Sequence, residues 1–342
     1  MDLSLGADNA VGVVVDLLLL AVGLALIVKG GDMFVDGSVW AARAFNVPET
    51  VIGATVVSVG TTLPEIITSL TSAIKGTAAG DSALAEGYNE IAVGNAVGSM
   101  LCNVGLIAAL VLIIKPPKTE RGFAGKGIFL LFASAFLAVF AFTGGGIDVW
   151  EGAALLALFV IFTGLNLYEA GRGRNMLSAV ADKVVVTKKS VAKNLALFAF
   201  GAAATALGAI LLVDNAQSLC VGMGVPQQIV GITVVAIGTS LPELVTSLTS
   251  LKKGRTGIGL GNVIGANVIN ATLLLGLVAC ATGRGLPIDG FTARFAVPAM
   301  LAVSALLVLP SAIAKKTYRW QGAAIIAVYL AFIVYNIISV VV

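Results

Sequence analysis

The sequence predicts an all-α polytopic membrane protein with ten transmembrane helices in two inverted five-helix repeats. Three observations predict this fold: an apolar composition, ten apolar segments of membrane-spanning length, and a long motif that occurs twice. Of the 342 residues, 58% are hydrophobic and 11% are charged, far from the averages of soluble domains. Only helices and closed barrels satisfy all backbone polar groups inside a bilayer, and these segments lack the alternation of barrel strands.

The ten segments each approach or exceed the roughly 20 residues that a helix needs to cross the hydrocarbon core. They lie at residues 10–28, 48–74, 90–114, 125–143, 149–168, 192–213, 226–251, 257–281, 294–314 and 320–341. If the N-terminus is outside, Lys75, Arg284 and Arg294 are the only external basic residues, as the positive-inside rule favours. We therefore expect both termini outside. The short loops favour a prokaryotic plasma membrane.

The repeated motif divides the chain into two halves. Residues 53–76 read GATVVSVGTTLPEIITSLTSAIKG, and residues 231–254 read GITVVAIGTSLPELVTSLTSLKKG. We expect a first repeat over residues 1–170, a basic cytoplasmic linker over 171–190 and a second repeat over 191–342. Because each half has an odd number of helices, the second half enters the membrane from the opposite face. Inverted repeats of this kind place a site near the bilayer midplane.

Each copy of the motif carries one acid in an apolar stretch, Glu65 or Glu243. A carboxylate inside a membrane is costly and usually functional, so the pair predicts a cation site. Hard cations such as Na⁺ and Ca²⁺ prefer several oxygen ligands. Nearby hydroxyl oxygens come from Thr61, Thr62, Thr239 and Ser240. Pro64 and Pro242 each remove a helical hydrogen bond, so we expect backbone carbonyls to be free as well. These carbonyls lie around Ser58, Val59, Ala236 and Ile237.

A second shared element follows each copy, GNAVGSMLCN at residues 94–103 and GNVIGANVIN at residues 261–270. Ser99 and Asn103 are four residues apart, so both project from one face of a helix. Asn270 holds the place of Asn103 in the second copy. We therefore expect both asparagines to offer neutral oxygen ligands, and the glycines four apart to permit close helix packing.

Other classes of protein are disfavoured by what the sequence lacks. The chain contains no His, which excludes an imidazole proton relay, a His metal ligand and a Ser-His-Asp triad. We expect no enzyme activity, no cofactor and no nucleic-acid partner. The residues leave several functions open: cation antiport driven by Na⁺, the same fold coupled to H⁺ or carrying another divalent cation, and a passive cation channel. The oligomeric state is not determined by the sequence.

The two motif pairs, GTTLPE with GNAVGSMLCN and GTSLPE with GNVIGANVIN, resemble the paired α-repeats of the sodium/calcium exchangers. The resemblance covers essentially the whole chain and implies secondary active antiport, in which Na⁺ entry drives Ca²⁺ out of the cell. It implies that the first and sixth helices slide as a gate against the other eight. The implied Ca²⁺ ligands are Glu65 and Glu243 with the carbonyls of Thr61 and Thr239. The implied Na⁺ ligands are the same acids with Thr62, Ser240, Ser99 and the carbonyls of Ser58 and Ala236.

The second copy departs from the exchangers at two positions. Ala266 stands where many relatives have Ser, and Asn270 stands where they have Asp. With two acids the site carries a charge of at most −2, which one Ca²⁺ or two Na⁺ neutralise. A third Na⁺ would leave a net positive charge in a medium of low dielectric constant. The sequence therefore favours a lower ratio of Na⁺ to Ca²⁺.

Overall fold

The computed structural model describes residues 10–45, 47–78, 82–117, 122–177, 186–222 and 236–341. Eight of the described helices are long and apolar enough to cross a membrane, and a ninth span results if one bent pair is counted together. Each of the nine coincides with a predicted segment. The remaining predicted segment, 226–251, is described only from Ala236 onward. Nine of the ten predicted spans are therefore found, and the tenth lies partly outside the described residues.

The first half runs from α1 to α8. Its elements are α1 (Ala10–Ala44), α2 (Glu49–Ile52), the π-helical turn η1 (Gly53–Val57), α3 (Ser58–Thr61), α4 (Leu63–Ala78), α5 (Ser82–Cys102), the π-helical turn η2 (Asn103–Ala108), α6 (Ala109–Ile114), α7 (Phe123–Thr143), β1 (Gly146–Ile147) and α8 (Val149–Leu177). The helices extend the predicted spans at one or both ends. The largest extension is in α1, which continues to Ala44 rather than ending near residue 28.

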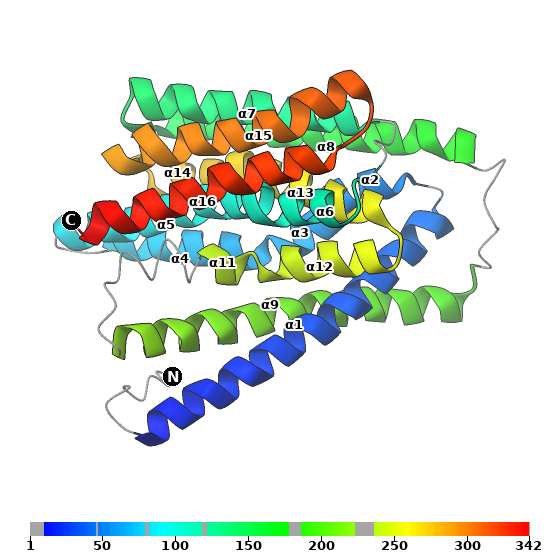
Figure 1. Cartoon of the computed structure of the whole chain (residues 1–342), viewed down its shortest axis with the longest axis horizontal. Coiled ribbons are helices and arrows are strands. Elements are labelled where there is room, and N and C mark those ends of the chain that lie inside the picture. Colours follow the sequence, from blue (N-terminus) through cyan, green and yellow to red (C-terminus); the bar gives the residue numbers. More distant parts are fainter. Residues whose placement is uncertain are drawn as a thin grey trace.

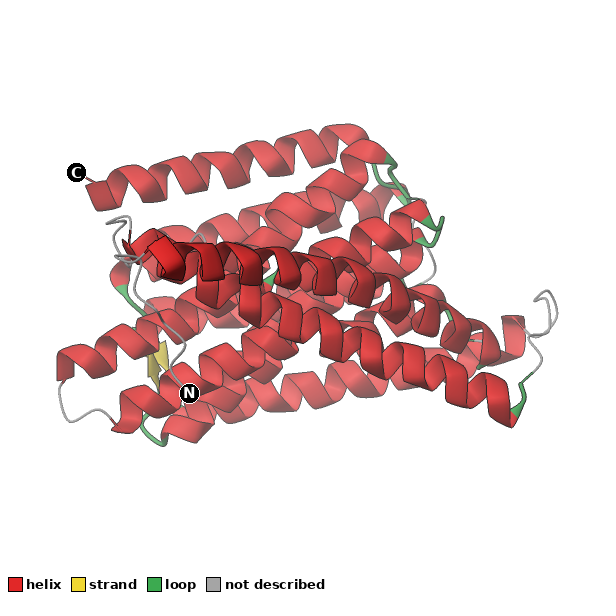
Figure 2. Cartoon of the chain, turned by 90° about the horizontal axis from the view of Figure 1, so that it is seen from below, coloured by secondary structure: helices red, strands yellow, loops and turns green. Residues whose placement is uncertain are grey.

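The second half contains a similar series of helices, but its short strand comes earlier, between α14 and η5. It contains α9 (Lys188–Gly222), α11 (Ala236–Thr239), α12 (Leu241–Lys252), α13 (Thr256–Ile269), the π-helical turn η4 (Asn270–Leu274), α14 (Leu275–Thr282), β2 (Leu286–Pro287), the π-helical turn η5 (Thr292–Ala296), α15 (Val297–Ala314) and α16 (Arg319–Val341). Helices account for most of the described chain; the rest consists of short loops and one short pair of strands, both visible in Figure 2.

The inversion of the two halves is seen directly in the pairing of α1 with α9, which lie together along one side of the bundle (Figure 1). Gly23 faces Gly208, and further along α1 Gly30 faces Gly201. Residue numbers rise in α1 as they fall in α9, so these corresponding helices run antiparallel. The start of α1 and the end of α16 lie at the same end of the bundle (Figure 1), as expected when both termini are on one side.

Loops that the predicted topology assigns to one side of the membrane contact each other. The connections before α8 and after α14 meet as strands β1 and β2, with Ile147 opposite Leu286. At the opposite end, the Thr317 hydroxyl donates to the Pro117 carbonyl at 2.6 Å. Arg255 Nη1 also donates to Glu49 Oε1 there, at 2.9 Å. These contacts support the alternation of the helices across the bilayer.

Two spans form the centre of the bundle. In the most apolar stretch of the span that contains α13, 83% of the residues are buried, whereas in the corresponding stretch of α8 17% are buried. The span that contains α5 is similarly enclosed, at 72%. The small residues Gly261 and Gly265 allow α13 to approach η1 and α3, since a Cβ on Gly265 would lie 2.6 Å from the Cα of Ala54. The predicted close packing of the second glycine pair is therefore confirmed.

Candidate cation site

The helix that carries Glu65 is broken just before the acid. Thr62 is not helical, and the segments Glu49–Thr61 and Leu63–Ala78 meet at a bend of 45°. Ser240 makes the corresponding break between α11 and α12. Pro64 and Pro242 follow these breaks and lack an amide N–H, so the carbonyls one turn earlier lose a helical donor. The repeated Pro thus produces the same interruption in both halves.

One expectation about freed carbonyls is wrong. The Ser58 carbonyl accepts the Thr62 amide at 2.9 Å and the Thr61 hydroxyl at 3.3 Å, so it takes part in the helix. Proline has no N–H to donate to the carbonyl four residues earlier, so Pro64 frees the Gly60 carbonyl rather than the Ser58 carbonyl. The side chain of Ala236, which begins α11, is outside the described residues.

The two repeated acids are both completely buried, as predicted. They come from corresponding helices of opposite halves, α4 and α12, and are close enough for their charges to interact. Thr62 donates to Glu243 Oε1 at 3.3 Å, which joins the first half to the acid of the second. Glu243 Oε2 and both carboxylate oxygens of Glu65 have no hydrogen-bond partner among the described residues. A buried carboxylate without a donor is strongly unfavourable, so these oxygens point to a cation.

Hydroxyl groups surround the acids across the boundary between the halves. Ser240 and Ser99 face the Glu65 carboxylate, while Thr61 and Thr62 face Glu243. All four are buried. Ser240 Oγ has no partner among the described groups. Each acid is therefore provided with neutral oxygens by the opposite half, which no single repeat could arrange alone.

The predicted asparagine ligands lie at equivalent backbone irregularities. Asn103 is the first residue of η2 and Asn270 is the first residue of η4. Both are fully buried, and both amide groups lack partners among the described residues. π-Helical turns inside α-helices are rare and are often found at functional sites. Both asparagines therefore present buried side-chain oxygens that accept no hydrogen bond from the described residues, as a candidate cation ligand would.

Sequence reasoning missed the role of two other asparagines, Asn95 and Asn262. Thr239 donates to Asn95 Oδ1 at 3.1 Å, and Thr61 donates to Asn262 Oδ1 at 3.1 Å. Each bond joins the broken helix of one half to the central helix of the other. Asn95 Nδ2 also donates to the Glu65 carbonyl at 3.1 Å. The repeated Gly-Asn dipeptide was the available signal, but the opposite-half partner cannot be inferred from spacing.

Replacing Asn95 with Leu should weaken ion binding without removing a ligand. The substitution leaves the Thr239 hydroxyl and the Glu65 carbonyl without their amide partner, at about 1 kcal/mol for each bond. We expect the Ca²⁺ concentration for half-maximal uptake to rise by about 30-fold, since the two bonds sum to about 2 kcal/mol and 1.4 kcal/mol corresponds to a factor of 10. The control is Asn336→Leu on α16, a buried amide outside the site. Equal effects of the two variants would contradict the positioning role.

The site offers two acids and several neutral oxygens as candidate ligands. No group of three or more His, Cys, Asp or Glu side chains that could hold a metal occurs in the part of the chain that the structure describes. The two acids must therefore be supplemented by hydroxyl, amide and carbonyl oxygens. Neutral oxygens suit Na⁺ and Ca²⁺, which are bound by several hard ligands. The set is compatible with one divalent cation or with monovalent cations sharing the same acids.

The sequence matches the family described as sodium/calcium exchanger protein over residues 15–168 and 193–338, which together cover most of the chain. The chain belongs to the sodium/calcium exchanger family. An uncharacterized membrane protein of Methanocaldococcus jannaschii is 34% identical over 90% of this chain and 93% of its own length. The sodium/calcium exchanger MaX1 of Methanosarcina acetivorans is 29% identical over 94% of this chain and 98% of its own.

Solved structures of exchangers agree with this assignment. The sodium-calcium exchanger NCX_Mj, soaked with Na⁺ and Sr²⁺, superposes with a TM-score of 0.78 at 32% identity. The match covers 94% of this chain and 98% of that exchanger. The similarity to the exchanger family therefore includes both inverted halves, and the chain is an integral membrane protein with the exchanger fold.

Proposed function

We propose that this exchanger is a secondary antiporter that moves Na⁺ down its gradient and carries Ca²⁺ in the opposite direction. The observation that carries the proposal is the pair of buried acids, Glu65 and Glu243. Three of their four carboxylate oxygens lack donors among the described residues, and neutral oxygens from both halves surround them. One ion set occupies the site at a time, because Na⁺ and Ca²⁺ depend on the same two charges. Competition for one site is the basis of exchange.

The proposed ligand assignment is supported by the site geometry and by the family membership. Ca²⁺ would be held by both carboxylates with the carbonyls of Thr61 and Thr239. Na⁺ would use the same acids with the oxygens of Thr62, Ser240 and Ser99 and the Ala236 carbonyl. The Ser58 carbonyl is left out because it already accepts two hydrogen bonds within its helix. Asn103 and Asn270 contribute amide oxygens. Oxygen ligands of this kind match the preference of hard cations.

The two-sided access that antiport needs would come from movement of α1 and α9 against the rest of the bundle. These two helices pack mainly against each other along their length. Only parts of them contact the helices that carry the acids. We infer that the pair moves as a unit and exposes the site to each side in turn, with both termini outside in a prokaryotic plasma membrane.

The direct test is uptake of radiolabelled Ca²⁺ into proteoliposomes loaded with Na⁺, compared with choline loading at equal pH and choline loading with a pH gradient. Uptake that requires internal Na⁺ would establish Na⁺/Ca²⁺ exchange. Uptake driven by the pH gradient alone would replace Na⁺ with H⁺ as the coupling ion. Flux without any counter-ion gradient would indicate a channel and would contradict the proposal.

The charge of the site predicts electroneutral exchange. Ala266 and Asn270 supply neither a hydroxyl nor a carboxylate, so the two glutamates provide the only ionisable oxygens among the described ligand candidates. Two Na⁺ or one Ca²⁺ neutralise this charge. An electrogenic cycle would gain about 2.3 kcal/mol per elementary charge per 100 mV of potential. We therefore expect K⁺ diffusion potentials of either sign to leave the initial rate of Ca²⁺ uptake nearly unchanged.

The matched variant for this prediction is Ala266→Ser combined with Asn270→Asp. It adds the hydroxyl and the acid that many exchangers carry at these positions. We expect its uptake to depend on potential and to rise more steeply with Na⁺ concentration than that of the unmodified protein. Strong dependence on potential in the unmodified protein would contradict the two-Na⁺ interpretation.

A further inference from the structure

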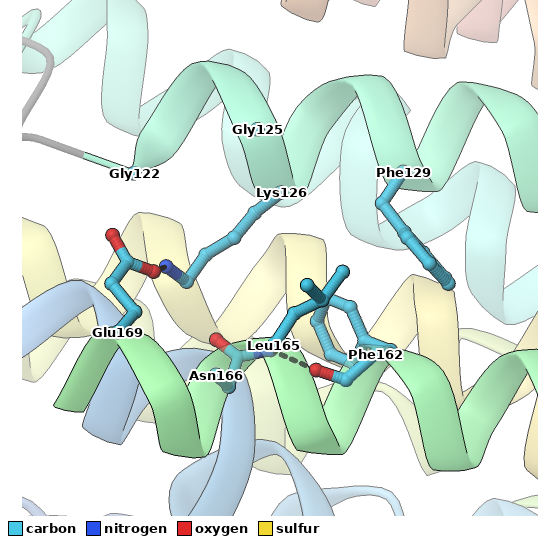
Figure 3. A pocket seen from close by; sticks show the side chains of 8 residues that line it. All are labelled: Gly122, Gly125, Lys126, Phe129, Phe162, Leu165, Asn166 and Glu169. Carbon is cyan, nitrogen blue, oxygen red and sulfur yellow. Dashed lines mark hydrogen bonds and ion pairs between the residues drawn. The ribbon is translucent and has the colours of Figure 1, made fainter. Parts of the chain in front are cut away.

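Outside the cation site, the structure contains a cavity of about 260 Å³ between α7 and α8 (Figure 3). Its lining combines an ion pair, an amide and two aromatic rings. Lys126 on α7 and Glu169 on α8 point toward one another across the cavity and form the ion pair. The proposed ion exchange does not use any of these residues.

The cavity has a polar end and an apolar end. Lys126 lies one turn from the start of α7, and Glu169 lies two residues before the end of the membrane-spanning part of α8. Phe129 and Phe162 lie deeper along the same helices, with ring centroids 5.1 Å apart. The polar groups are therefore near the membrane boundary and the rings extend toward its interior. A phospholipid has the same order of polarity along its length.

The mouth of the cavity faces the surface that contacts lipid. Leu165 on its rim is 54% exposed, and the adjacent outward positions of α7 and α8 include the exposed side chains of Ile128 and Ile161. Gly125 is exposed as well, and a Cβ added there would meet no atom within 4 Å. The opening therefore has room for an acyl chain beside α7.

One buried polar atom in the cavity lacks a partner. Asn166 is 2% exposed and donates through Nδ2 to the Phe162 carbonyl at 2.8 Å. Its Oδ1 is buried and accepts no hydrogen bond from the described residues. A buried amide oxygen normally has a donor, so a ligand with an N–H or O–H group would satisfy it. This oxygen distinguishes the cavity from a simple gap between helices.

The charges of the cavity select the headgroup. Lys126 and Glu169 neutralise each other, so the site has no net charge for an anionic lipid. Lys126 retains N–H groups beyond the one used by Glu169, and these suit a phosphate oxygen. The Glu169 carboxylate, 31% exposed, and Asn166 Oδ1 are acceptors that suit an ammonium group. A zwitterionic headgroup with an N–H donor matches all three.

We propose that the α7–α8 cavity binds one aminophospholipid of the phosphatidylethanolamine class. Its phosphate contacts Lys126, its ammonium group contacts Glu169 and Asn166, and an acyl chain passes Gly125 along the aromatic rings. The lipid would fix the end of the α7–α8 hairpin at the membrane boundary. Because the proposal concerns the membrane surface, it does not depend on which ions the exchanger carries.

The test is native mass spectrometry of the purified exchanger after incubation with phosphatidylethanolamine, phosphatidylcholine or phosphatidylglycerol. We expect one retained phosphatidylethanolamine, bound at least about tenfold more tightly than phosphatidylcholine, whose quaternary ammonium has no N–H to donate. Equal retention of all three lipids would show only non-selective lipid contact. Stronger retention of phosphatidylglycerol would show an anion site. Either result would overturn the proposal.

Two variants locate the lipid. Gly125→Leu fills the open space at the mouth, and Lys126→Met with Glu169→Gln removes both charges together, which avoids leaving one buried charge unpaired. We expect both to lower phosphatidylethanolamine retention to the level of phosphatidylcholine. Gly164→Leu, at a position of α8 that is equally open but not part of the cavity lining, is the matched control. Unchanged retention in monodisperse Gly125→Leu protein would also overturn the proposal.

Discussion

Glu65→Gln and Glu243→Gln should each reduce Na⁺-driven Ca²⁺ uptake by about 100-fold or more. Gln keeps the size of the side chain and removes one of the two charges that balance the bound ions. Removing the anion from a buried pair of opposite charges, here a carboxylate and the bound cation, typically costs about 3–5 kcal/mol. Each 1.4 kcal/mol corresponds to a factor of 10. Because both positions are fully buried, water cannot stabilise the positive charge that the missing carboxylate leaves unbalanced.

The measurement is the initial rate of radiolabelled Ca²⁺ uptake into Na⁺-loaded proteoliposomes, at equal amounts of reconstituted protein. Glu90→Gln is the matched control, because Glu90 is an exposed acid on α5, the helix that also carries Ser99. The control should retain most of the rate. Substantial uptake by either site variant would show that the two acids are not both ligands.

Gly201→Val should disrupt the contact between α1 and α9 and impair transport by about tenfold or more. A Cβ at Gly201 would lie 2.5 Å from the Phe34 amide nitrogen and 2.8 Å from the Gly30 carbonyl oxygen. These are backbone atoms, so the clash can be relieved only if the helices move apart. Overpacking of this kind costs about 1–3 kcal/mol, and the displaced pair would no longer move as a unit.

The thermal stability of the purified variant and its rate of Ca²⁺ uptake provide two independent measurements. Gly164→Val places the same side chain on α8, where a Cβ would meet no atom within 4 Å. This control should keep both its stability and its rate. A Gly201→Val protein with unchanged transport would show that tight contact between α1 and α9 is not required.

The sequence predicted the transmembrane fold well because the bilayer imposes a simple rule on every span. About 20 apolar residues are needed for each crossing, and this length is visible in composition alone. The odd number of helices per half then predicted the inversion, which the antiparallel pairing of α1 and α9 confirms. The ends of the helices were less predictable, as the extension of α1 to Ala44 shows, because helices continue beyond the hydrocarbon core.

The ligand candidates Glu65 and Glu243 were also evident from sequence, since a carboxylate within a membrane-spanning segment is costly and is usually kept for function. What the sequence did not predict was the connection between the halves. The bonds from Thr61 to Asn262 and from Thr239 to Asn95 join residues far apart in the chain, and the π-helical turns at Asn103 and Asn270 have no local signal.

The sequence by itself therefore determined the type and approximate positions of the spans, the inverted repeat and the chemistry of the two acids. Those features depend on local composition and on the length of each helix. Only the tertiary structure decided which hydroxyls face each acid and which asparagines accept from Thr61 and Thr239. It also decided that Lys126 meets Glu169 beside Asn166 Oδ1, which has no partner among the described residues. Such contacts depend on how helices pack across the bundle, and packing is not encoded by the spacing within any one helix.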